Sequence, residues 1–312
     1  MKTLITGSMA YDTLMSFEDQ FKNLILPDQI HKLNVSFLTP QMQRRLGGCA
    51  GNIAYNLNML GGDPMIMATV GEDFELYASH LEALEIASDH IKVIEGQFTA
   101  QAFITSDLDN NQINAFHPGA MNFSQMNHID DAQDIELGII SPDGRDGMLL
   151  HGAQFAEANI PFIFDPGQQL PMFNGEELLT FCDQATYVVT NDYESQMLVE
   201  KTGKSIEQLS ERVDTFIVTR GSNGSSIYNS GKVIEISTAP ISGTKEPTGC
   251  GDAYRAGLLF GLSKGLGWQE CGQIASLCGA IKIEHSGTQE HRFTLDQFAQ
   301  RYTTAFDQAW PL

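Results

Sequence analysis

A short glycine-rich segment near residue 250 combines an anion-binding backbone with a carboxylate. It reads Pro247-Thr248-Gly249-Cys250-Gly251-Asp252, and an apolar face that begins at Ala253 predicts that a helix follows. The N-terminus of a helix presents unpaired N–H groups and the positive end of a dipole, which together bind phosphate. Glycine at 249 and 251 lets the backbone approach such an anion closely. Asp252 would lie beside the anion, where it could take a proton from an attacking hydroxyl group.

The same residues also have a purely structural interpretation, because the helix dipole favours an acid such as Asp252 in any first turn. Two other nucleotide-binding motifs are excluded. A dinucleotide-binding fingerprint needs a glycine where this chain has Tyr254. A P-loop reading of residues 202–205 needs a glycine where this chain has Leu198.

The segment 247–253 resembles the C-terminal signature Asp-Thr/Pro-x-Gly-Ala-Gly-Asp of the ribokinase (PfkB-type) family of carbohydrate and nucleoside kinases, and its wording is most similar to bacterial adenosine-kinase-like members. The run 47–54, Gly-Gly-x-x-x-Asn-x-Ala, is similar to the family's N-terminal signature. Two weaker matches are Asn-x-x-Glu at 191–194 and Thr-x-Gly-x-x-Gly at 219–224. The four matches stand in the expected order and span essentially the whole chain.

This resemblance implies ATP-dependent phosphorylation of a primary alcohol, in particular the 5′-hydroxyl group of adenosine. Asp252 would be the general base, and the backbone of Gly249, Cys250 and Gly251 would stabilise the transferring phosphoryl group. The implied binding residues are Asp12, Gly48 and Asn52 for sugar hydroxyls, Asn191, Glu194, Thr219, Gly221 and Gly224 for ATP, and Glu194, through water, for Mg²⁺.

Several of these residues also fit structural roles when they are considered alone. Asp12 is typical of a turn aspartate, and Asn191 with Glu194 forms the spacing of a helix capping box. Glu246 stands where the family usually has an aspartate that shapes a monovalent-cation loop, so a K⁺ requirement does not follow from the resemblance. Two positions in the family's adenine wall, Cys278 and Ala280, are further candidates for nucleotide contact.

Short apolar runs alternate with helical patterns along most of the chain, which predicts a doubly wound α/β fold with a mostly parallel sheet. The predicted strands are 4–6, 65–70, 135–141, 160–164, 186–190 and 216–219, with a hairpin over 225–237. Predicted helices include 148–158, 194–200, 273–284 and one capped by Thr294 and Gln297.

Two insertions with strand-like alternation predict a small β lid. They are residues 33–37 and a hairpin over 98–117. We expect a large nucleotide-binding domain from residues 1–10, 47–95 and 120–312, and a lid from 11–46 and 96–119. A lid would exclude water from the reaction, and the lids of two chains could pack together as a homodimer. Its aromatic side chains, Phe37, Phe103 and Phe116, are candidates either to contact a purine or to pack within the lid.

The composition limits the remaining alternatives. A net charge of −21 argues against nucleic acid or an anionic membrane as a partner. The five cysteines form no CxxC pair and no zinc-like spacing, which favours reduced thiols in the cytoplasm, and no signal peptide or membrane span is expected. His285 and His291 are expected at the surface. The alternative functions are a ribokinase-type or fructokinase-type sugar kinase, and a catalytically silent nucleoside-binding protein.

Overall fold

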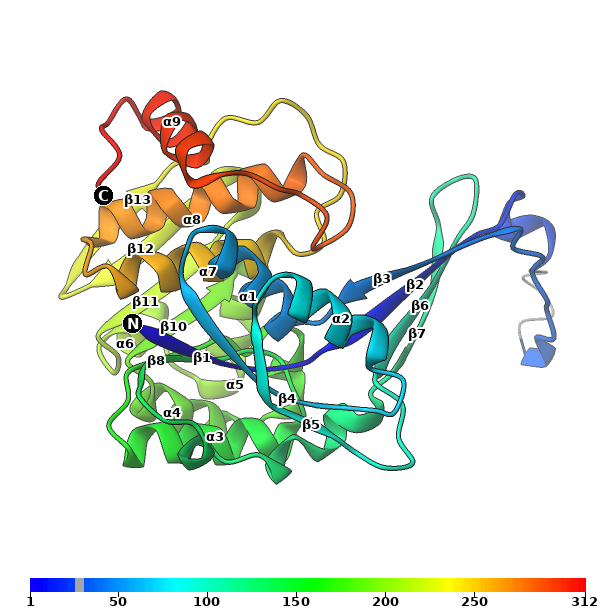
Figure 1. The fold of residues 1–312 in the computed structure, drawn as a ribbon, viewed down its shortest axis with the longest axis horizontal. Coiled ribbons are helices and arrows are strands. Elements are labelled where there is room, and N and C mark those ends of the chain that lie inside the picture. Colours follow the sequence, from blue (N-terminus) through cyan, green and yellow to red (C-terminus); the bar gives the residue numbers. More distant parts are fainter. Residues whose placement is uncertain (26–30) are drawn as a thin grey trace.

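In a computed structural model of the protein, which describes residues 1–25 and 31–312, two β-sheets are present (Figure 1). The strands of the larger sheet are β1 (Lys2–Thr6), β4 (Asp63–Val70), β5 (Ala87–Val93), β8 (Ile135–Ile140), β9 (Phe162–Phe164), β10 (Tyr187–Asn191), β11 (Thr215–Thr219), β12 (Ser225–Asn229) and β13 (Lys232–Ile236). Their order is β13-β12-β11-β10-β9-β8-β1-β4-β5. Within the described part of this larger sheet, only the pairings of β12, with β11 and with β13, are antiparallel.

The central strands are parallel and helices cover both faces of the sheet, so these strands are apolar on both faces. Strand β11, for example, buries four of its five residues. The structure confirms each predicted strand of this sheet, and the hairpin turn at Ser230 and Gly231 has positive φ at both residues. Strand β5 was not predicted, since Ser88, Asp89 and His90 interrupt its apolar pattern at the edge of the sheet.

Helices pack on both faces of the larger sheet (Figure 1). One layer contains α1 (Cys49–Met59), α2 (Glu75–Ala83), α7 (Cys250–Ser263), α8 (Trp268–Ile283) and α9 (Leu295–Phe306). The other contains α3 (Arg145–Glu157), α4 (Gly175–Gln184), α5 (Asp192–Thr202) and α6 (Ile206–Ser210). Short 3₁₀ turns are η1 (Phe21–Asn23), η3 (Gly119–Met126), η4 (Ile129–Asp131), η5 (Gly167–Met172) and η6 (Gly221–Asn223). This two-layer cover confirms the predicted doubly wound fold.

The smaller sheet projects to one side of the larger sheet (Figure 1). It contains β2 (Ala10–Ser16), β3 (Gln41–Gly47), β6 (Ala100–Ser106) and β7 (Gln112–His117) in the order β3-β2-β6-β7. Strands β6 and β7 form the predicted hairpin. The separate small sheet therefore confirms the fold class with a lid. The exact domain boundaries and the homodimer through the lid stay predictions.

The predicted strand at residues 33–37 is wrong. The segment forms no strand, and Phe37 instead packs against Phe17 and Phe21, with ring centroids 5.2 Å and 4.9 Å away. Alternation alone could not distinguish an aromatic cluster from a paired strand. Residues 26–30, part of the predicted lid segment 11–46, lie outside the described residues. Across the described part of the chain, no helix is both long enough and apolar enough to cross a membrane.

Candidate active site

The N-terminus of α7 presents free backbone donors, as its sequence predicts. Gly249 is the N-cap residue, with φ of 83°, and no side chain caps the helix. The N–H of Cys250 donates to the carbonyl oxygen of Pro247 at 3.1 Å. The N–H groups of Gly249 and Gly251 have no protein acceptor among the described residues. These two donors are therefore available to an anion, whereas the Cys250 N–H already has an acceptor.

The carboxylate of Asp252 lies beside this helix tip and accepts a hydrogen bond from the Nδ2 of Asn52 at 2.8 Å. Burial raises the pKa of Asp252 to about 6, although the Asn52 bond acts in the opposite direction. A carboxylate with this pKa is ionised at neutral pH and can still accept a proton efficiently. Asp252 is thus held in place by Asn52 of α1, and it does more than interact with the dipole of α7.

Asn52 is fixed by a chain of buried hydrogen bonds that the sequence did not reveal. Gln289 donates from Nε2 to the Oδ1 of Asn52 at 2.9 Å and to the Tyr77 hydroxyl at 2.6 Å. The Tyr77 hydroxyl donates to the carbonyl oxygen of Gly47 at 2.9 Å. Because Gln289 donates to Oδ1, the Nδ2 of Asn52 must face Asp252.

The histidine prediction was wrong for His291. Its side chain is buried, and its Nε2 lies 2.8 Å from the Oδ1 of Asn56. His285 is only half-buried, and its Nδ1 lies 2.8 Å from the carbonyl oxygen of Ile281. His291 therefore belongs to the polar interior behind α1, where a partner on α1 satisfies one of its ring nitrogens.

A cavity of about 620 Å³ lies between the helix tip and the small sheet. Asp12, Gly48 and Asn52, the predicted sugar-binding residues, all line it together with Gly249 and Asp252. Asp12 lies within β2, and burial and the nearby Glu246 raise its pKa to about 6.

Gly48 occupies a position that only glycine fits. Its φ is 86°, and a Cβ there would lie 2.5 Å from the carbonyl oxygen of Ser8 and 2.6 Å from the N of Ala10. Glycine at 48 is therefore required by the close packing of this loop against the backbone of residues 8–10, and its role in substrate binding stays a prediction.

The three aromatic candidates of the lid have different surroundings. Phe116 pairs with Ala102, which in turn pairs with Asp12, and all three line the 620 Å³ cavity. Phe103 is the next residue along β6 and therefore faces away from the cavity. Phe37 packs in the aromatic cluster described above. Of the three, only Phe116 is placed to contact a ligand.

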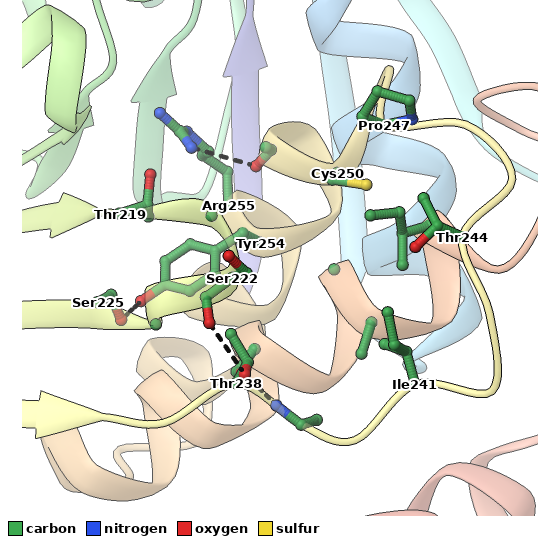
Figure 2. Close-up of a pocket in the computed structure, with 18 residues that line it drawn as sticks. Thr219, Ser222, Ser225, Thr238, Ile241, Thr244, Pro247, Cys250, Tyr254 and Arg255 are labelled. Carbon is green, nitrogen blue, oxygen red and sulfur yellow. Dashed lines mark hydrogen bonds between the residues drawn. The ribbon is translucent and has the colours of Figure 1, made fainter.

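A second cavity, of about 360 Å³, lies on the other side of the helix tip (Figure 2). Thr219, Gly221 and Gly224, three of the predicted nucleotide-binding residues, line it. Figure 2 shows Thr219, Ser222 and Ser225 on one side, and Ile241, Thr244 and Pro247 on the loop at the other side. Gly251 lines both cavities, so the two spaces meet at the N-terminus of α7.

Only one of the two adenine-wall candidates lines this second cavity. Ala280 does, together with Gly279 and Ile283 on the same side. Cys278 does not, because its side chain is buried in the core between α8 and the sheet. The helical pattern in the sequence predicted helix α8 correctly, but it did not predict which residues of the helix face the cavity and which face the core.

Asn191 and Glu194 line neither cavity. They form the predicted capping box of α5, in which the Glu194 carboxylate accepts from both the N and the Nδ2 of Asn191. Glu194 also lies 4.0 Å from the guanidinium of Arg255, and burial together with Asp165 raises its pKa. Through this contact with Arg255, the capping box of α5 is linked to α7.

Arg255 and Asp165 form a buried ion pair that sequence reasoning missed. The Nε and Nη2 of Arg255 each lie 2.9 Å from an oxygen of Asp165, and its Nη1 donates to the carbonyl oxygen of Gly251 at 3.4 Å. Asp165 directly follows β9, and Arg255 interrupts the apolar face of α7. An arginine on a buried helix face was the one signal in the sequence that could have indicated this pair.

The described residues, 1–25 and 31–312, contain no group of three or more His, Cys, Asp or Glu side chains that could hold a metal ion. Acidic side chains nevertheless gather near the helix tip, where Asp165 raises the pKa of both Glu194 and Asp252. Arg255 compensates part of this negative charge. A cation bound here would therefore need ligands from a bound anion or water as well as from the protein.

Comparison with known proteins agrees with this geometry. Residues 13–294 match the family described as pfkB family carbohydrate kinase. The nucleoside kinase of Burkholderia thailandensis in complex with inosine is 46% identical, with a TM-score of 0.89 over 98% of this chain and 99% of that chain. Its complex with ADP-inosine is 47% identical, with a TM-score of 0.87 over 98% and 97%.

A nucleoside kinase of Methanocaldococcus jannaschii is 33% identical over 272 residues, which cover 86% of this chain and 89% of that protein. The ribokinase of Thermotoga maritima is only 18% identical but has a TM-score of 0.81 over 96% of this chain and 98% of that chain, which shows the shared fold. With a family match over most of its length and the same fold as these kinases, the chain belongs to the pfkB family of carbohydrate kinases and is a kinase.

Proposed function

We propose that the protein is an ATP-dependent nucleoside kinase that phosphorylates the 5′-hydroxyl group of adenosine. The observation that carries this proposal is the pair of cavities that meet at Gly251, with the Asp252 carboxylate on the lid side. The lid-side cavity would hold the acceptor, and the other cavity would hold ATP. A volume of about 620 Å³ lies within the usual range of small-molecule sites.

Asp252 would act as the general base. As the acceptor hydroxyl attacks, its proton passes to the Asp252 carboxylate, and a bond forms between the 5′ oxygen and the γ-phosphorus. The bond between that phosphorus and the β–γ bridging oxygen breaks, and ADP leaves with the electron pair. The N–H groups of Gly249 and Gly251, with the dipole of α7, stabilise the negative charge that gathers on the transferring group.

When bound, Mg²⁺ would neutralise charge on the ATP phosphates. The residues present fit an ion held mainly by those phosphates and by water, since the described side chains provide no complete ligand set. Both Glu194 oxygens already accept bonds from Asn191, so Glu194 and the neighbouring Asp165 would act through water. Thr219, Gly221 and Gly224 would contact the nucleotide itself.

A nucleoside is favoured over a free sugar as the acceptor by two observations. First, Phe116 and Met121 give the lid-side cavity apolar surface, on which a base can stack, in addition to the polar Asp12 and Asn52. Second, the 46%-identical Burkholderia thailandensis protein was solved with inosine, a purine nucleoside. Asp12 can accept bonds from two neighbouring hydroxyl groups, as a ribose cis-diol requires.

An ADP-coupled assay with adenosine, inosine, ribose and fructose tests the proposal. We expect turnover with the nucleosides, adenosine included, and little with the free sugars. Turnover of ribose or fructose alone would instead identify a sugar kinase, and efficient use of inosine with rejection of adenosine would refute adenosine as the substrate. Tight adenosine binding in calorimetry without ADP formation would indicate a binding protein that has lost catalysis.

A further inference from the structure

A lysine side chain is completely buried next to the anion-binding loop. Lys282 lies near the end of α8 with 0% of its surface exposed. Its Nζ donates to the carbonyl oxygen of Glu246 at 2.9 Å and to that of His285 at 3.2 Å. Burying an ammonium group is costly unless strong acceptors replace its water, and two main-chain carbonyl groups do so here. The mechanism above leaves this charge without a role.

The two carbonyl groups belong to segments that form the back of the helix tip. Residues 245–249 lead directly into α7, and the N–H of Lys245 donates to the carbonyl oxygen of Ile283 at 2.8 Å. Residues 284–288 follow α8. The Cε of Lys282 lies 3.5 Å from the place where a Cβ on Gly249 would be. The ammonium therefore ties both segments together immediately behind the proposed phosphate site.

The surrounding charges leave no place for a second cation. The carboxylate of Glu246 pairs with Arg45 at 2.9 Å and accepts the N–H of Gly287 at 2.9 Å. Arg45 also lies 3.5 Å from Glu290. Arg45 and the Lys282 ammonium already balance the two carboxylates, Glu246 and Glu290, and Lys282 already occupies the two carbonyl oxygens, so a K⁺ ion would find neither uncompensated negative charge nor free ligands. The residues here do not fit a bound monovalent cation.

We propose that the ammonium group of Lys282 is a built-in substitute for a monovalent cation, which holds the 245–251 loop in its phosphate-binding conformation and makes the kinase independent of added K⁺. Lys282 is a positioning residue, because it acts through the carbonyl groups of Glu246 and His285 and touches no reacting atom. This inference rests on the proposed phosphoryl transfer for its kinetic readout, but not for the structural readout described below.

The first test measures the wild-type kinase at constant ionic strength with K⁺, Na⁺, NH₄⁺ or tetramethylammonium as the only monovalent cation. We expect kcat values that agree within about twofold. Strong activation by K⁺ or NH₄⁺ over tetramethylammonium would refute the proposal, because it would require a cation site that the ammonium of Lys282 does not fill. This measurement needs no variant and so does not depend on the folding of a mutant.

The second test compares Lys282→Met with Lys201→Met. Lys201 is a matched control, since its Nζ also donates to two main-chain carbonyl groups, those of Pro171 and Phe173, at 2.9 Å and 2.7 Å but outside both cavities. We expect Lys282→Met to lower kcat by about tenfold or more, and K⁺ or NH₄⁺ to restore part of it. Lys201→Met should keep its kcat and show no cation response.

The structural readout is the melting temperature. K⁺, but not tetramethylammonium, should raise the melting temperature of Lys282→Met, and neither ion should change that of the wild type or of Lys201→Met. A folded Lys282→Met that shows no cation response in either readout would refute the proposal and leave Lys282 a packing role. If no acceptor is phosphorylated by any form, the proposed function fails while the melting experiment still decides this inference.

Discussion

The Nδ2 of Asn52 donates to the Oδ2 of Asp252 at 2.8 Å, although the two residues are 200 positions apart in the chain. This bond joins the glycine-rich start of α1 to that of α7. Gln289 holds the Asn52 amide in the required orientation from the opposite side. As a result, Asn52, the substrate-binding residue proposed from the N-terminal signature, positions Asp252, the general base proposed from the C-terminal signature.

Replacing Asp252 with asparagine should abolish most turnover and preserve the fold. Loss of a general base lowers kcat by about 10²–10⁴-fold. The folded-state pKa of Asp252 is about 6, above that of an unfolded aspartate, so its ionisation costs stability as pH rises through this range. Asp252→Asn removes that cost, and its melting temperature at pH 7 should equal or exceed the wild-type value. Near-normal kcat in this variant would disprove the mechanism.

The pH profile should show an acid limb near pH 6. Below that pH the Asp252 carboxylate is protonated and cannot accept the hydroxyl proton, so kcat should fall by about tenfold per pH unit. Asp12 also has a pKa of about 6, and its protonation should raise KM for the acceptor. Steady-state kinetics between pH 5 and pH 8 separate the two effects. A kcat that stays constant down to about pH 5 would exclude Asp252 as the base.

Gly249→Ala should lower kcat by much more than its loss of folding stability can explain. Gly249 has φ of 83°, and a Cβ there would lie 3.0 Å from Thr288 at the edge of the anion site. Gly61 is a matched control with φ of 76° and open space around its Cα. Both substitutions should cost about 1–2 kcal/mol of stability, because alanine disfavours positive φ. Only Gly249→Ala should also lower kcat, which thermal unfolding and kinetics together will show.

Phe116→Ala should weaken nucleoside binding, with Phe103→Ala as its control. Phe116 lines the lid-side cavity, whereas Phe103 lies on the other face of the same sheet. Loss of one aromatic stacking surface costs about 1–3 kcal/mol, so the Kd for adenosine should rise by about tenfold or more. Calorimetric titration with adenosine measures this directly. Equal affinity in the two variants would place the base elsewhere in the cavity.

Local features of the sequence predicted the parts of this structure that depend on neighbouring residues. The capping boxes of α5 and α9 each need only residues three positions apart, and both were predicted correctly. Buried strands such as β8 and β11 are recognised from their own apolar runs. Gly48 and Gly249 both have positive φ, a backbone conformation that favours glycine. The family and the fold class follow from these local patterns.

Only the tertiary structure decided which distant side chains meet. The pairs Asn52–Asp252, Asp165–Arg255 and Glu246–Lys282 are separated by 200, 90 and 36 residues. Such contacts depend on strand order and on how each helix is rotated against the sheet, which no local pattern specifies. The same dependence explains why residues 33–37 form no strand and why Cys278 faces the core. The tertiary fold decides which strands pair and which side of a helix packs against the sheet.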